Sequence, residues 1–107
     1  MRTVELLYFE GCPGVAATEQ AVAHALRELG IAWQVEVRRT VIVDAQGARA
    51  LRFLGSPSIR VDGRDVEPGA EQRTAFGLQC RVYLVEGRLQ NTPPREWIVR
   101  ALGLVES

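Results

Sequence analysis

The start of the chain most constrains its fold, because it predicts a strand that is covered on both faces. Val4, Leu6 and Tyr8 would lie on one face of this strand, and Leu7 and Phe9 on the other. A strand with apolar residues on both faces is typical of a central position in a sheet flanked by helices. The sequence therefore predicts an α/β fold with this strand inside the sheet.

A helix is predicted directly after this strand, over residues 13–29. Apolar residues recur there at helical spacing, at Val15, Val22, Leu26 and Leu29. Gly30 is typical of the residue that follows a helix, and Pro13 fits the first turn, where its missing N–H costs nothing. We therefore expect Cys12 at or next to the N-cap.

The remaining elements alternate in the same way. The patterns predict a strand from about residue 32, a helix over 45–54, strands over 58–61 and 64–66, a loop over 67–79, a strand over 80–85 and a last helix ending at Gly103. The two middle strands form a hairpin, because Asp62-Gly63 suits a type I′ turn. We expect Trp33, Trp97 and Leu51 to be buried.

Composition limits the possible functions. A chain of 107 residues predicts one domain over 1–107, and its 13 basic and 13 acidic residues cancel, which argues against nucleic acid or an anionic membrane as a partner. No apolar run reaches the roughly 18 residues needed to cross a bilayer, and the first residues do not resemble a secretory signal. We therefore expect a cytoplasmic protein, in which the two cysteines are reactive or buried rather than a permanent bridge.

The order of motifs resembles the thioredoxin superfamily. A strand leads to Cys12-Pro13-Gly14-Val15 at a helix start, and about 45 residues later Ser56-Pro57 precedes the hairpin. The Cys-Pro order is nearer the glutaredoxin form, but Val15 stands where the family has its second cysteine. The strings YFEGCPG, LGSPSIRVDGRDVEPG and GLQCRVY also resemble a group of small bacterial thioredoxin-like proteins.

This resemblance implies a three-layer fold with a central mixed sheet of about four strands, flanked by helices, and an extra segment before the last helix. It also implies that Pro57 is a cis-proline packed against the reactive cysteine. In the family, the residue before that proline offers its main-chain N–H and C=O to a peptide or to glutathione. Ser56 would be that docking residue here, with Pro13 and Pro57 beside it.

The position of Cys12 has a chemical meaning of its own. A thiolate is the nucleophile in disulfide exchange, and a helix N-terminus stabilises a thiolate through its free N–H groups and its positive dipole end. Cys12 lies between Gly11 and Pro13, outside any apolar stripe, which favours a reactive cysteine over a buried one.

Cys80 has two interpretations. It can share a core-facing side of its strand with Val82 and Leu84. Alternatively, because position 15 carries no thiol and Cys80 is the only other cysteine, the loop over 67–79 returns Cys80 to Cys12 as a resolving thiol or a second metal ligand.

Three functions follow from these observations. The first is a thiol-disulfide oxidoreductase in which Cys12 attacks a protein or low-molecular-weight disulfide and is released by Cys80 or glutathione. The second is a module that binds mercury, copper(I), zinc or a glutathione-ligated cluster through Cys12 and Cys80. The third is a redox-inert thioredoxin-like interaction domain, which the missing second cysteine of the motif favours.

Overall fold

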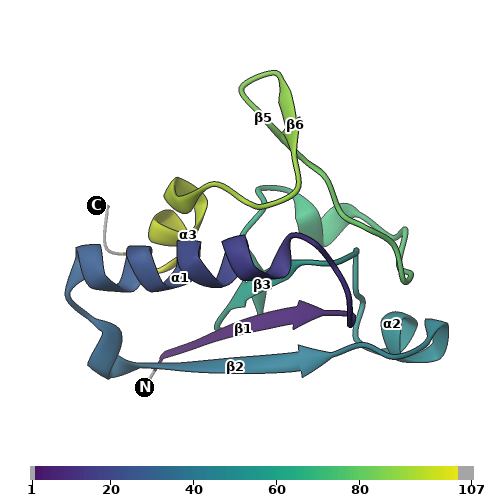
Figure 1. The fold of residues 1–107 in the computed structure, drawn as a ribbon, viewed down its shortest axis with the longest axis horizontal. Helices are drawn as coiled ribbons and strands as arrows, with labels where there is room; N and C mark the ends of the chain where they lie inside the picture. The colour runs from purple at the N-terminus through teal and green to yellow at the C-terminus, as the bar shows by residue number, and fades with distance from the viewer. Residues whose placement is uncertain (1, 104–107) are drawn as a thin grey trace.

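A four-stranded mixed sheet forms the centre of the computed structural model, which describes residues 2–103 (Figure 1). Its strands are β1 (Arg2–Tyr8), β2 (Val35–Val41), β3 (Ser58–Val61) and β4 (Arg64–Asp65). They lie in the order β2-β1-β3-β4, with β1 parallel to β2 and antiparallel to β3. The interior position of β1 confirms the prediction from its two apolar faces.

Helices and a second, smaller sheet complete the chain. They are α1 (Val15–Leu29), α2 (Ala45–Ala50), α3 (Arg95–Ala101), the 3-10 turns η1 (Ala32–Gln34) and η2 (Ala70–Gln72), and the hairpin of β5 (Tyr83–Val85) and β6 (Arg88–Gln90). The element order is the predicted one, including the extra segment before the last helix. In Figure 1 the β5–β6 hairpin projects away from the rest of the molecule.

Local sequence explains where several elements end. Asp62 and Gly63 have φ values of 51° and 87°, as the predicted turn between β3 and β4 requires. The Asp44 carboxylate accepts a hydrogen bond from the Gly47 N–H at 2.7 Å and so caps α2. The N-cap of α1 is Gly14 rather than Cys12, because Pro13 and Gly14 form a turn ahead of the helix.

One face of the sheet carries the main core. α1 and α3 pack on this face, and the apolar residues of β1 that point toward them are buried against both helices (Figure 1). The most buried members of this core are Val4, Leu6, Val22, Leu26, Ile59, Ile98 and Leu102. The alternation of β1 thus separates this core from the opposite face.

The opposite face is covered at one end. There Leu7 of β1 packs with Ile42, Ala48 of α2 and Phe53 in a second cluster of buried residues. Because α2 is six residues long, it extends over little of the sheet. The layout is therefore an α/β fold compatible with a thioredoxin-like arrangement, with the layer on this side reduced to α2 and its neighbours.

Two expectations about apolar residues are wrong. Trp33 is 79% exposed, because η1 carries it past the edge of the sheet before β2 begins. Leu51 is 42% exposed, because α2 ends at Ala50 and Leu51 follows the helix as its C-cap. Among residues 2–103, no helix has the length and apolar character needed to cross a membrane.

Candidate functional site

The Cys12 segment leads from β1 into the start of α1. The Cys12 N–H donates to the Phe9 carbonyl at 3.3 Å, and the Cys12 carbonyl accepts from the Val15 N–H at 3.4 Å. Pro13 is exposed, and the Cys12 side chain is partly exposed and forms no disulfide. These contacts place Cys12 three residues ahead of α1, at the positive end of the helix.

Gly14 lies directly against the Ser56-Pro57 loop. The Ser56-Pro57 peptide bond is cis, as the resemblance implies. A Cβ atom on Gly14 would lie 3.3 Å from Cδ of Pro57 and 2.8 Å from the carbonyl oxygen of Asn91. Glycine is therefore required at position 14 by close packing, which brings the start of α1 onto Pro57.

Ser56 connects the Cys12 segment to the Cys80 segment. Its Oγ accepts from the Phe9 N–H at 3.3 Å, and its own N–H donates to the Gln79 carbonyl at 2.9 Å. The Ser56 carbonyl accepts from the Arg81 N–H, also at 2.9 Å. These two main-chain bonds form a parallel bridge that pairs Ser56 with Cys80. Paired strands lie about 4.8 Å apart, so Cys80 is a direct neighbour of Ser56.

The chain itself therefore occupies the main-chain groups that the resemblance assigns to a substrate. Both the N–H and the C=O of Ser56 are bonded to residues 79 and 81, and Ser56 is 1% exposed. The residue paired with it is a cysteine, Cys80, which is exposed and forms no disulfide.

The expectation that Cys80 could share a core-facing side with Val82 and Leu84 is wrong. Val82 is 54% exposed and Leu84 is 64% exposed, and the buried residues of this stretch are Arg81 and Tyr83 instead. Buried and exposed residues do alternate in this stretch, but the buried face carries Arg81 and Tyr83 and the exposed face carries Val82 and Leu84.

Arg81 is held by two acidic residues. One terminal nitrogen lies 2.7 Å from Oδ2 of Asp65, and the other lies 2.7 Å from Oε1 of Glu67. Oγ of Ser58 accepts a further hydrogen bond from Arg81 at 2.8 Å. Burial disfavours the cation, but the hydrogen bonds and charge of Asp65, with the contribution of Glu67, outweigh it and raise the pKa of Arg81. Arg81 therefore stays charged although its side chain is 1% exposed.

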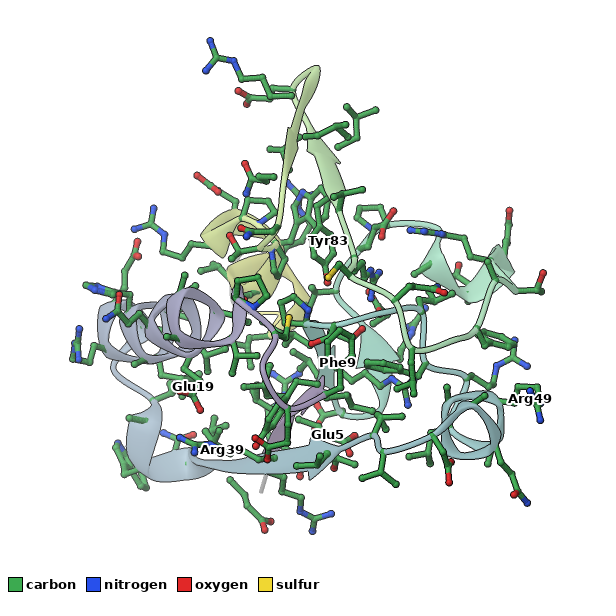
Figure 2. The ribbon with its side chains drawn as sticks, turned by 45° about the vertical axis from the view of Figure 1, so that its right-hand side comes forward. Glu5, Phe9, Glu19, Arg39, Arg49 and Tyr83 are labelled. Carbon is green, nitrogen blue, oxygen red and sulfur yellow. The ribbon has the colours of Figure 1, made fainter. Side chains whose placement is uncertain are left out.

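Tyr83 attaches the same segment to the cis-proline. Its hydroxyl donates to the Pro57 carbonyl at 2.5 Å, and burial raises its pKa, so the hydroxyl keeps its proton. The Arg81 guanidinium lies over the Tyr83 ring, 4.6 Å from its centroid. Figure 2 shows Tyr83 at the base of the projecting hairpin.

Sequence reasoning missed this cluster of Arg81, Asp65, Glu67 and Tyr83. The available signal was an arginine inside an apolar strand pattern, following two acidic residues two positions apart. That signal is weak, because a charged residue in a strand is normally exposed and its acidic partners lie 14 and 16 residues earlier in the chain.

A mostly apolar hollow of about 310 Å³ adjoins both segments. Its apolar walls are Phe9, Val41, Ile42, Val43 and Leu78, and Glu10 also lines it. Glu10 and Leu78 each lie two residues before a cysteine in the sequence. The hollow therefore offers apolar surface close to the Cys12 and Cys80 segments.

The described part of the chain contains no group of three or more His, Cys, Asp or Glu side chains arranged to hold a metal ion. Cys12 and Cys80 remain two possible thiolate ligands. Comparison with known family models, with curated proteins and with solved structures gives no match.

Proposed function

We propose that this chain is a thiol-disulfide oxidoreductase of thioredoxin or glutaredoxin type, with Cys12 as nucleophile and Cys80 as resolving thiol. One observation supports it most: Ser56 is hydrogen-bonded both to Phe9, which holds the Cys12 N–H, and to the two residues that flank Cys80. The only two cysteines of the chain, 68 positions apart, therefore border the same loop.

The geometry suggests which thiol attacks first. Cys12 lies at the positive end of α1, a helix of 15 residues, where a thiolate is stabilised. Cys80 lies on an extended segment that is bonded to Ser56 on both sides of the cysteine. Cys12 would therefore supply the attacking thiolate and Cys80 the second thiol.

The reaction has two exchange steps. The Cys12 thiolate attacks one sulfur of a substrate disulfide, forms a mixed disulfide and releases the other substrate sulfur as a thiolate. The Cys80 thiolate then attacks the Cys12 sulfur and releases the second substrate thiolate. The substrate gains two electrons, and the chain becomes the Cys12–Cys80 disulfide, which glutathione or another thiol reduces in the next cycle.

The position of the Cys80 segment also affects substrate binding. A peptide cannot pair with the main chain of Ser56 unless residues 79–81 leave it, because both groups are already bonded. The apolar hollow beside Phe9 and Leu78 would then contact the group that carries the disulfide. Low-molecular-weight disulfides and disulfides next to apolar side chains are the substrates that this arrangement fits.

The test is mass spectrometry of the protein equilibrated with a glutathione redox buffer, together with a disulfide-reduction assay. We expect an intramolecular Cys12–Cys80 disulfide in the wild type. Cys80→Ser should accumulate a mixed disulfide on Cys12, whereas Cys12→Ser should lose reduction of the substrate. The two variants control for each other, because each keeps one thiol.

Two outcomes would contradict the proposal. One is a wild-type chain that forms no intramolecular disulfide and reduces no substrate. The other is a Cys12→Ser variant that reduces disulfides as fast as the wild type. Native mass spectrometry after incubation with mercury, copper(I) or zinc would then test the two cysteines as metal ligands.

A further inference from the structure

Within residues 2–103 the outer edge of β2 is unpaired, since β2 is the terminal strand of the sheet and pairs with β1 alone. The Ile42 N–H donates to the Tyr8 carbonyl at 2.7 Å, which fixes the direction of the main-chain groups along β2. In a parallel pair these groups alternate, so those of Val37, Arg39 and Val41 point away from β1. This edge can accept another strand.

Exposed apolar side chains lie along the same edge. Trp33 is 79% exposed, Val37 is 49% exposed and Val41 is 39% exposed. A mostly apolar hollow of about 350 Å³ lies between this edge and α1, lined by Val37 and by core residues of β1 and α1. The Arg39 side chain lies across it to reach Glu19 of α1, with 2.6 Å between nitrogen and oxygen (Figure 2).

We propose that β2 pairs antiparallel with β2 of a second copy of this chain, about a two-fold axis through Val37. In this register Val37 lies opposite Val37 of the second copy, and the two residues exchange main-chain hydrogen bonds because their free groups point outward. The two sheets become one sheet of eight strands, with both α1 helices on the same face.

Charge favours this register over those centred on the charged residues of β2. Charged residues on an edge strand usually prevent pairing with other chains. A two-fold axis through Glu36, Arg38 or Arg39 would place two identical charges directly opposite each other. The axis through Val37 instead places Glu36 opposite Arg38 of the second copy, and does so twice by symmetry.

Glu36 and Arg38 are positioned to form ion pairs with Arg38 and Glu36 of the second copy. They point to the same side of β2 and already form an ion pair, with 3.0 Å between Nε and Oε2. Both side chains are exposed, at 61% for Arg38 and 47% for Glu36, so neither is committed to the core. On the other face, the apolar Val37 side chains of the two copies meet beside the hollow.

The test is sedimentation equilibrium of the wild-type chain and of charge variants on β2. We expect a dimer, and we expect Glu36→Arg or Arg38→Glu alone to raise its dissociation constant about tenfold or more, because each change opposes like charges at two symmetric positions. The double variant Glu36→Arg with Arg38→Glu restores the opposite charges and should dimerise nearly as well as the wild type.

The matched control is the same pair of changes at the tip of the β5–β6 hairpin, Glu86→Arg and Arg88→Glu, which should leave the dimer unchanged. Val37→Arg provides a second test, because it places two cations on the axis at an exposed position that does not support the core. A wild-type chain that is monomeric at about 100 µM, where a dimer with a dissociation constant of about 1 µM would be mostly associated, overturns the proposal. So does a dimer that withstands the single charge changes.

Discussion

The two segments that carry the cysteines reach the same loop but are held there by different forces. The Cys12 segment continues into α1, whose apolar side chains pack in the main core, and a Cβ on Gly14 would lie 3.3 Å from Cδ of Pro57. The Cys80 segment lies outside both core clusters and is held by main-chain bonds to Ser56, by the charges of Arg81, Asp65 and Glu67 and by the Tyr83 hydroxyl.

This difference determines how a substitution in each segment affects the stability of the fold. Apolar packing depends on shape and loses stability when a substitution leaves a cavity or adds volume that does not fit. A buried ion pair depends on both partners, because removing one leaves the other without compensation. The Cys80 segment should therefore be the more sensitive of the two to a single polar substitution.

The largest effect is expected for Arg81→Met, which leaves Asp65 without its cation and leaves Glu67 paired with Arg73 alone. We expect a loss of about 3 kcal/mol in the free energy of unfolding, since removal of one partner from a buried ion pair is strongly destabilising. Urea unfolding of the variant and the wild type measures this difference in the free energy of unfolding. Adding Asp65→Asn and Glu67→Gln to the same variant should recover part of the loss, and no recovery would show that packing rather than charge holds this segment.

A smaller effect is expected on the other segment, for Gly14→Ala. The added methyl group would lie 2.8 Å from the Asn91 carbonyl oxygen, so the loop or the helix start must move. We expect a loss of about 2 kcal/mol, as is typical of overpacking, measured by urea unfolding. Gly47→Ala in α2 is the control and should be nearly neutral: helices favour alanine, and the added methyl group would lie 3.2 Å from Oδ1 of Asp44, a side chain that can shift. If Gly14→Ala costs no more than this control, the close packing of Gly14 against Asn91 and Pro57 is wrong.

The smallest effect is expected for Tyr83→Phe, which removes one hydroxyl and keeps the ring. The Pro57 carbonyl loses its hydrogen-bond donor, and we expect a loss of about 1 kcal/mol in the free energy of unfolding. The ring still packs edge-on against Trp97, with centroids 6.0 Å apart, so Tyr83→Ala should cost clearly more. Equal losses for the two variants would mean that the ring contributes nothing.

Local patterns predicted most of the sheet and the helices. The apolar faces of β1, the turn at Asp62-Gly63 and the Asp44 cap are properties of neighbouring residues, so they can be read before the chain is folded. The prediction that Trp33 is buried also rests on a local property, the apolar character of its side chain. Its exposure results from a 3-10 turn that no strong signal marks.

The candidate site was predictable only in part. Cys12, Ser56 and Pro57 lie in short motifs, so the sequence indicated them directly. The partners of Ser56 could not be predicted, because its bonds to residues 79 and 81 join segments more than 20 residues apart. The face of the Cys80 stretch was predicted wrongly, since an alternating pattern does not show that Arg81 has two acidic partners to neutralise it.

The β5–β6 hairpin has a further consequence for how this chain can change in length. Its tip, Glu86-Gly87, is exposed and projects from the body, whereas its base is fixed through Tyr83 (Figure 1). Extra residues at the tip would extend into solvent without reaching Pro57. The hairpin is therefore the place in this fold where insertions can accumulate, and where a fluorophore or an affinity tag can be added without touching either cysteine.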